Sequence, residues 1–371
     1  MAGAPDDERF MAEAIRLSLT NLGHTSTNPS VGCLIVKDGE IVGRGVTARG
    51  GRPHAEPQAL ADAGERARGA TAYVTLEPCS HHGKTPPCAE ALIAAGVARV
   101  VVSVTDPDER VSGRGLKMLE DAGIEVSTGV LEREGRRALA GYLTRQTKDR
   151  PYVILKLAVS RDGMIGRKGG GQVAITGPLA REEVQRLRVE TDAILVGIGT
   201  ALADDPLLTV RLQGLEDRSP TRIVLDRNLD LPLTSKLVST AREVPLIVVC
   251  NAGSERADDS GAAMALAARR AGLEEKGVEI LEAGDLGSLL FALASRGISS
   301  LLVEGGARVA SDFLAADLVD EIRLYEGAME IGSEGVASPL RLANIPQHFH
   351  LLRSRNVGSD RLDTFERAAE A

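Results

Sequence analysis

The feature that most constrains the fold of this chain is an alternation of short apolar runs with amphipathic helical segments, repeated in both halves. In the first half, β-branched apolar runs flank the turn signal Asp38-Gly39, which predicts a hairpin over 31–46. Further strands are expected at 70–77, 98–106 and 124–131, with helices at 6–23, 54–67, 86–97 and 115–123. Strands that alternate with helices predict an α/β domain of three layers.

The pattern restarts after a polar stretch at 145–150, where a new apolar run begins at Pro151. A chain of 371 residues exceeds what a single core usually organises. We therefore expect two domains, 1–147 and 151–371. The second half again predicts α/β structure, with a closing strand pair after residue 330. Its other expected elements are a helix at 178–190 and strands at 151–160, 192–200, 221–226, 245–250, 300–307 and 320–327.

Charge and apolar patterning exclude several classes of protein. The net charge of −8 argues against non-specific binding to nucleic acid. No apolar run approaches the roughly 20 residues that span a bilayer, so no membrane partner is expected. The N-terminal segment carries acids where an export signal needs positive charge, and four cysteines are too few for a disulfide framework. These observations predict a cytoplasmic protein.

Two short motifs in the first half carry ligands for a metal ion. His54-Ala55-Glu56 precedes the segment "EPCSHHGKTPPC" at 77–88, which contains Cys79 and Cys88. One imidazole and two thiolates suit zinc, and three protein ligands leave the fourth tetrahedral position for water. A carboxylate at Glu56 beside the metal can accept and return protons. The alternatives are a structural zinc site completed by His81 or His82, and a metal-free pair of buried thiols.

The spacing of these motifs resembles one branch of the zinc deaminases, which share the pattern H-x-E…P-C-x-x-C. Here the second cysteine follows the first by nine residues instead of three. The extended segment, together with "NPSVGCLIV" at 28–36 and "AGVARVV" at 95–101, resembles the bifunctional riboflavin-biosynthesis deaminase/reductase family. The resemblance implies a cytidine-deaminase-like domain, zinc as its metal, and contacts to the substrate from Asn28, His81 and Lys84. For each of these three residues, an ordinary position in a solvated loop or turn is the alternative.

The second half carries weaker signals when it is considered alone. Gly305-Gly306 joins a strand to a helix, where backbone N–H groups can bind phosphate, but the Rossmann fingerprint is absent. The order of segments such as "ILKLAVSRDGMIG", "DAILVGIGTALADDPLLTVR" and "LLVEGGARVASDFL" resembles the reductase half of the same family. That resemblance implies a fold like dihydrofolate reductase, NADPH as cofactor, and two sets of contacts. The cofactor would contact Ala158, Thr200, Asp204, Gly306, Ala307 and Arg308, and the substrate would contact Lys156, Gln172, Arg188, Leu208, Arg211 and Glu304.

Three positions depart from the family's pattern. Ala174 stands where many relatives carry tryptophan, Gln172 where a serine is expected, and Arg227 where relatives use a serine near the cofactor. An arginine at 227 either binds the 2′-phosphate of NADPH or marks a site that has drifted.

The sequence therefore predicts a riboflavin-biosynthesis enzyme that deaminates a phosphorylated pyrimidine and then reduces its ribosyl group to ribityl. We expect it to form a homo-oligomer, a dimer or tetramer, as relatives commonly do. The rival hypotheses are a deaminase with a decayed second half, a deaminase of nucleosides or tRNA, and a non-catalytic zinc-binding regulator.

Overall fold

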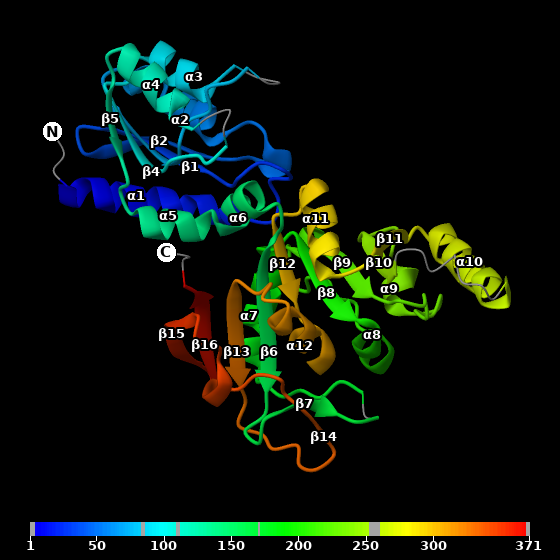
Figure 1. Ribbon diagram of the computed structural model, residues 1–371. Helices are drawn as coiled ribbons and strands as arrows, with labels where there is room; N and C mark the ends of the chain where they lie inside the picture. Colours follow the sequence, from blue (N-terminus) through cyan, green and yellow to red (C-terminus); the bar gives the residue numbers. More distant parts are fainter. Residues whose placement is uncertain (1–3, 83–85, 109–111, 170, 252–259, 369–371) are drawn as a thin grey trace. The chain divides into compact units, whose positions relative to one another are not determined.

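The computed structural model describes residues 4–82, 86–108, 112–169, 171–251 and 260–368 (Figure 1). The chain divides into two compact units, Met1–Arg150 and Pro151–Ala371. Each unit has its own main sheet and its own buried apolar clusters. None of the described helices is both long and apolar enough to cross a membrane.

Unit 1 is organised around a five-stranded mixed sheet in the order β2–β1–β3–β4–β5 within its described residues. Its strands are β1 (Gly32–Lys37), β2 (Glu40–Val46), β3 (Thr71–Leu76), β4 (Arg99–Val104) and β5 (Glu125–Thr128). β1 pairs antiparallel with β2 and β3, while β3–β4 and β4–β5 are parallel. The hairpin prediction is confirmed, because Asp38 and Gly39 have φ angles of 52° and 79°, as a type I′ turn requires.

Helices cover both faces of this sheet, which confirms the three-layer expectation. Figure 1 shows α1 and α5 on one face and α2, α3 and α4 on the other. The helices are α1 (Ala4–Ser18), α2 (Ala55–Ala63), α3 (Cys88–Ala95), α4 (Arg114–Asp121), α5 (Glu132–Ala138) and α6 (Ala140–Lys148). The sequence prediction was wrong at 145–148, where the expected polar break is the last turn of α6, a helix whose Tyr142 and Leu143 pack against the core.

Two glycines of β2 let α2 pack very close to the sheet. A Cβ atom built on Gly45 would lie 2.0 Å from the carbonyl oxygen of Ala55, and one on Gly43 would lie 2.2 Å from that of Ala59. Because both contacts are with helix backbone, any side chain larger than hydrogen would displace α2. The glycines therefore set the position of the first turn of α2, which carries Glu56 and follows His54.

Unit 2 contains a nine-stranded sheet in the order β11–β10–β9–β8–β12–β6–β13–β16–β15 within its described residues. The strands from β11 to β13 are parallel, and β16 and β15 complete the sheet antiparallel. The strands are β6 (Tyr152–Val159), β8 (Ala193–Gly197), β9 (Thr221–Leu225), β10 (Leu246–Asn251), β11 (Glu279–Ala283), β12 (Ser300–Val303), β13 (Glu321–Glu326), β15 (Phe349–Val357) and β16 (Asp360–Arg367). The expected closing strand pair is β15–β16.

Helices and a small second sheet complete unit 2. The helices are α7 (Pro178–Val189), α8 (Ile198–Asp204), α9 (Lys236–Ser239), α10 (Ser260–Glu275), α11 (Leu286–Ser295) and α12 (Ala307–Ala315), and the small sheet pairs β7 (Met164–Arg167) with β14 (Gly335–Ala337). The chain leaves β8, β9 and β12 at their carboxyl ends, which lie along one edge of the parallel sheet. Ligands of open α/β sheets bind at this edge, where the strand order changes direction.

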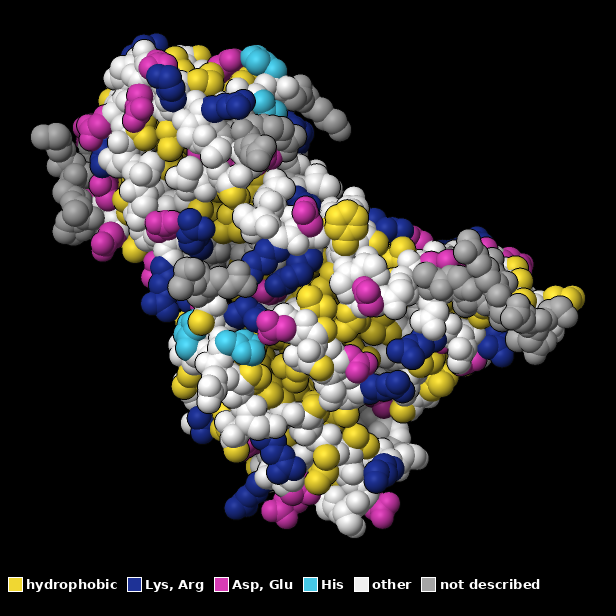
Figure 2. All heavy atoms as spheres, in the orientation of Figure 1, with side chains coloured by type: hydrophobic (Ala, Val, Ile, Leu, Met, Phe, Trp, Pro, Cys, Tyr) yellow, Lys and Arg dark blue, Asp and Glu magenta, His cyan; other side chains and the backbone are white. Residues whose placement is uncertain are grey.

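The surface drawn in Figure 2 carries basic and acidic side chains interspersed on both units. No continuous basic area covers the described residues of this face. The view agrees with the net charge of −8.

Candidate active sites

Three side chains of unit 1 converge as the sequence predicts. His54 is the N-cap of α2, Cys79 lies in the turn after β3, and Cys88 is the first residue of α3. The Nδ1 atom of His54 lies 3.4 Å from the Sγ of Cys88 and 3.8 Å from the Sγ of Cys79. The three ligand atoms lie within 4.8 Å of one another, and they are the metal-ligand cluster found among the described residues.

The geometry of this cluster fits a tetrahedral zinc ion. Zinc bonds of about 2.0 Å to nitrogen and 2.3 Å to sulfur, at tetrahedral angles, place the two donors about 3.5 Å apart. The observed nitrogen–sulfur distances of 3.4 and 3.8 Å bracket that value. Neither His81 nor His82 belongs to the cluster, and the Nε2 of His82 instead lies 3.0 Å from the Oε1 of Glu90. Among the residues that the structure describes, the site offers three protein ligands, the number that a catalytic zinc site uses.

The two cysteines of the cluster have opposite pKa shifts. The hydrogen bond with Cys88 is the main cause that lowers the pKa of Cys79 to about 4, and the same contact raises the pKa of Cys88. A cation between the sulfurs would favour thiolate at both. Glu56 is only 4% exposed, and burial, followed by the negative charge of Cys79, raises its pKa to about 7. A carboxyl group poised near neutral pH can both accept and donate a proton.

The three predicted substrate contacts of unit 1 fare differently. Asn28 packs beside the metal cluster's own segment, since a Cβ on Gly51 would lie 2.3 Å from its Nδ2 and Gly51 precedes His54 by three residues. His81 is exposed, in the segment that follows Cys79. Lys84 lies outside the described residues. The structure therefore places Asn28 against the segment that leads to His54, and the substrate roles of all three residues stay predictions.

Sequence reasoning missed Glu77, which precedes Pro78 and Cys79. Its carboxylate is 3% exposed and accepts backbone N–H groups from Asp106 at 3.3 Å, Gly113 at 3.0 Å and Gly115 at 3.1 Å. A buried carboxylate satisfied by three amides holds the turn of Cys79 against the start of α4. The only sequence feature that pointed to a role for Glu77 was its position directly before Pro78 and Cys79.

Unit 2 contains a cavity of about 1090 Å³ at the carboxyl edge of its parallel strands. Every residue that the resemblance implied for this half lines the cavity. These are Lys156, Ala158, Gln172, Arg188, Thr200, Asp204, Leu208, Arg211, Glu304, Gly306, Ala307 and Arg308. The three departures from the family pattern, Ala174, Gln172 and Arg227, line it as well. The volume suits a large ligand, since drug-sized pockets reach about 1,000 Å³.

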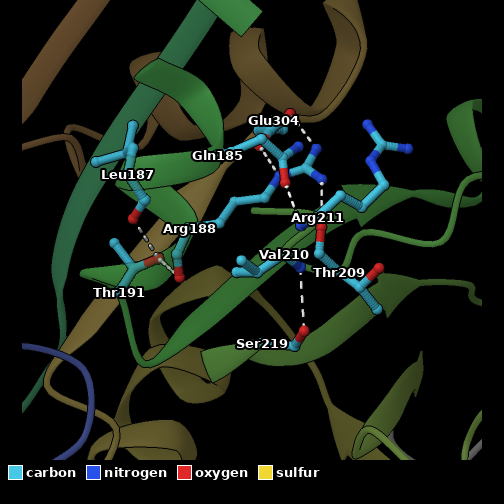
Figure 3. Close-up of polar contacts among 9 residues, drawn as sticks. All are labelled: Gln185, Leu187, Arg188, Thr191, Thr209, Val210, Arg211, Ser219 and Glu304. Atoms are coloured by element: carbon cyan, nitrogen blue, oxygen red, sulfur yellow. Dashed lines mark hydrogen bonds and ion pairs between the residues drawn. The ribbon is translucent and has the colours of Figure 1, made fainter. Parts of the chain in front are cut away.

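The floor of the cavity is a buried ion pair that the sequence did not predict. Figure 3 shows the guanidinium of Arg188 turned to the carboxylate of Glu304, with Nε–Oε1 at 2.8 Å and Nη2–Oε2 at 3.0 Å. Arg188 also donates to the carbonyl of Thr209 at 3.1 Å. Burial opposes ionisation of Glu304, but the charges of Arg188 and Lys156 hold its pKa below the usual value. Arg188 and Glu304, which were both predicted to contact the substrate, are therefore also ion-paired with each other.

Arg211, Lys156 and the Gly306–Thr200 contact add further polar groups to the cavity's lining. The backbone N–H of Arg211 donates to Gln185 at 2.8 Å, while its guanidinium lies apart from the Arg188–Glu304 pair in Figure 3. Burial lowers the pKa of Lys156, and the nearby carboxylate of Glu304 opposes that shift. The amide of Gly306 donates to Thr200 at 3.0 Å at the N-terminus of α12. Such a helix end favours anions, so the lining fits a phosphorylated dinucleotide.

Two protein-family models match the chain. The model described as the cytidine and deoxycytidylate deaminase zinc-binding region matches residues 4–104. The model described as the RibD C-terminal domain matches residues 151–362. The two models fall on the two units.

Individual relatives match nearly the whole chain. The riboflavin biosynthesis protein RibD of Escherichia coli is 42% identical over 363 residues, covering 95% of this chain and 97% of its own length. The structure of Acinetobacter baumannii RibD, form 1, has a TM-score of 0.85 at 36% identity and covers 99% of this chain and 100% of that one. A diaminohydroxyphosphoribosylaminopyrimidine deaminase/5-amino-6-(5-phosphoribosylamino)uracil reductase of Thermotoga maritima has a TM-score of 0.84 at 35% identity, over 98% of this chain and 99% of that one.

Proposed function

The chain belongs to the RibD family of riboflavin biosynthesis proteins, and from that premise we propose that its two units catalyse the two reactions of its Thermotoga maritima relative. Unit 1 removes the ring amino group of a diamino-ribosylamino-pyrimidinone 5′-phosphate. Unit 2 reduces the ribosyl group of the deaminated product to ribityl with NADPH. The observation that carries the proposal is the presence in one chain of both the His54/Cys79/Cys88 cluster with Glu56 and the complete cavity lining.

In the deaminase step, His54, Cys79 and Cys88 would hold zinc, whose Lewis acidity activates water for attack on the amidine carbon. Glu56 takes a proton from the attacking water and delivers it to the ring nitrogen. It then takes a second proton from the hydroxyl formed on the attacked carbon and delivers it to the amino group, which leaves as ammonia while the carbonyl forms. The burial of Glu56, which raises its pKa, suits a group that both takes up and releases protons. Asn28 holds the pyrimidine ring, and His81 and Lys84 contact the ribosyl phosphate.

In the reduction step, NADPH supplies a hydride, and the chain's task is to place the two reactants. Ala158, Thr200, Asp204 and the 306–308 turn contact the cofactor. Lys156, Leu208 and Gln172 contact the sugar being reduced, and the Arg188–Glu304 pair lines the same cavity.

Phosphate recognition in unit 2 follows from two exposed positions. Arg211 binds the 5′-phosphate of the substrate, since its guanidinium is turned away from the buried ion pair. Arg227 is exposed at the carboxyl end of β9, on the cavity wall. An arginine at this place in a nucleotide-binding sheet accommodates a 2′-phosphate. We assign Arg227 to the group that distinguishes NADPH from NADH.

One assay tests both activities on the same preparation. The phosphorylated diaminopyrimidinone is supplied, release of ammonia is followed first, and oxidation of NADPH is followed second. Ammonia release without NADPH oxidation would show a deaminase whose second unit is inactive. Zinc binding without either activity would indicate a regulator.

Glu56→Gln tests the proton-transfer role. We expect zinc content to be retained and the deamination rate to fall by about 10²–10⁴-fold. The matched control is Glu65→Gln, an exposed glutamate shortly after α2. Full deaminase activity in the zinc-loaded Glu56→Gln protein would refute the mechanism.

We further propose that the protein acts in the cytoplasm and self-associates as a dimer or tetramer. None of the four cysteines, all of which the structure describes, forms a disulfide, and two of them must stay reduced to bind metal, which suits a reducing compartment. β15 is the last strand of its sheet, and its Leu351 is 52% exposed. Light scattering on the purified chain measures the mass directly, and a monomer at micromolar concentration would rule out the association.

A further inference from the structure

Helix α6 contacts the segment 106–108, which follows β4 in unit 1. The hydroxyl of Tyr142, a residue only 9% exposed, donates to the carboxylate of Asp106, with oxygen distances of 3.0 and 3.1 Å. Gln146 donates to the Tyr142 hydroxyl at 3.2 Å and to Asp108 at 3.3 Å. Asp106 is itself 6% exposed and accepts the backbone N–H of Asp108 at 2.9 Å. The helix therefore fixes the 106–108 turn through buried polar contacts.

The 106–108 turn is hydrogen-bonded to the segment that carries Cys79. Glu77 accepts the backbone N–H groups of Asp106 and Gly113 on one carboxylate oxygen and that of Gly115 on the other. A Cβ on Gly115 would lie 2.1 Å from the carbonyl oxygen of Pro78, so the two segments touch backbone to backbone. A shift of the 106–108 turn is thereby transmitted to the turn of Cys79.

The same helix also contacts the turn that presents Asn28. Arg145, one helical turn beyond Tyr142, donates to the carbonyl of Thr27. The Asn28 turn is closed by Thr25, whose hydroxyl donates to the carbonyl of Asn28 at 2.7 Å. α6 thus holds two turns from distant parts of the sequence, one beside the metal-ligand segment and one carrying a proposed substrate contact.

We propose that α6 is a positioning element of the deaminase: Tyr142 and Gln146 set the 106–108 turn, and Arg145 sets the Asn28 turn, in the arrangement that binds the phosphorylated pyrimidine. The inference rests on the proposed deaminase function. It places working parts of that site beyond residue 104, where the match to the deaminase zinc-binding region ends. Tyr142, Arg145 and Gln146 touch no proposed ligand and act through the turns they hold.

The test is Tyr142→Phe in the full-length, zinc-loaded chain. Tyr73→Phe is a matched control, because Tyr73 is also buried in unit 1 and donates to a carboxylate, Asp7, at 2.8 Å, on the side of the sheet covered by α1. We measure zinc content, KM and kcat of deamination, and the NADPH-dependent rate on the deaminated substrate. Tyr142→Phe should raise the KM of deamination about tenfold and change kcat less, with zinc content and reduction unchanged.

The control should keep the wild-type KM even where it melts at a lower temperature. Arg145→Met, at a less buried position, provides a second variant if Tyr142→Phe folds poorly, and it should also raise the KM of deamination. An unchanged KM in both α6 variants, an equal rise in Tyr73→Phe, or loss of zinc from the α6 variants would overturn the inference. A wild-type chain that does not deaminate overturns the proposed function and this inference together, whereas an active wild type with unaffected variants overturns the inference alone.

Discussion

Replacing Gly45 with alanine should separate the two activities of the chain. The new Cβ would lie 2.0 Å from the carbonyl oxygen of Ala55 and 2.6 Å from the backbone nitrogen of Ala59, both in α2. Real Cβ contacts do not fall below 3.0 Å, so the first turn of α2 must retreat by about 1 Å. That turn carries Glu56, whereas Cys79 and Cys88 belong to other elements and do not move with it.

The size of the effect follows from that displacement. A misplacement of about 1 Å at a reacting group costs on the order of 10²-fold in rate, so the kcat of deamination should fall about 100-fold. Overpacking should cost about 1–3 kcal/mol in the stability of unit 1. At roughly 2–4 °C per kcal/mol, its melting temperature should fall by about 2–12 °C.

The assay measures deamination, NADPH-dependent reduction and zinc content on one preparation. The reduction rate is an internal control, because Gly45 and the reductase cavity belong to different units. Gly284→Ala is the matched control, since a Cβ there meets no atom within 4 Å. A Gly45→Ala chain with wild-type kcat of deamination and full zinc content would refute the claim that glycine packing sets the position of Glu56.

Three further perturbations test other parts of the structure. Arg188→Met leaves the carboxylate of Glu304 buried without its partner and should cost about 3–5 kcal/mol by urea unfolding. Arg186→Met, which breaks an exposed pair on the same helix, should cost less than about 1 kcal/mol. An equal loss of stability in the two variants would contradict the claim that the buried pair matters more. Arg227→Ala should raise the KM for NADPH about tenfold while leaving that for NADH unchanged, and a parallel rise in both would remove its assignment to the 2′-phosphate. Burial opposes the ionisation of Asp7, but a bidentate arginine and a tyrosine hydroxyl hold its pKa below the usual value. Its stabilising contribution is therefore complete above about pH 4 and is lost as the pH falls further, so Asp7→Asn should flatten the fall in melting temperature on acidification, and an unchanged slope would count against it.

The metal cluster could be predicted because its information is local. His54 with Glu56, and Cys79 with Cys88, lie in two short motifs whose ligand chemistry is readable from side-chain identity. The hairpin was equally local, since Asp38-Gly39 is a turn signal in its own right. In unit 2, by contrast, the residues that line the cavity were assigned by family resemblance, because no local motif there specifies a reaction.

The last turn of helix α6 could not be predicted for a physical reason. The stretch from Arg145 to Arg150 is polar and has no apolar periodicity, so it indicated a break. In the structure, the apolar contacts of α6 come earlier, from Tyr142, and its last turn is stabilised by side-chain contacts with distant turns. Polar residues that bind other loops look the same in a sequence as polar residues that face solvent.

The pairing of Arg188 with Glu304 could not be predicted either, and it changes how the substrate contacts are interpreted. The two residues are 116 positions apart, and a sequence does not show whether opposite charges meet each other or a ligand. Arg188 donates from all three guanidinium nitrogens to Glu304 and Thr209, which uses three of the five N–H groups of an arginine. The two arginines that the resemblance assigned to the substrate therefore differ in their surroundings, since the guanidinium of Arg211 lies apart from this ion pair. We propose that Arg188 neutralises a buried carboxylate that would otherwise repel an anionic substrate, and that Arg211 carries the charge that the substrate meets.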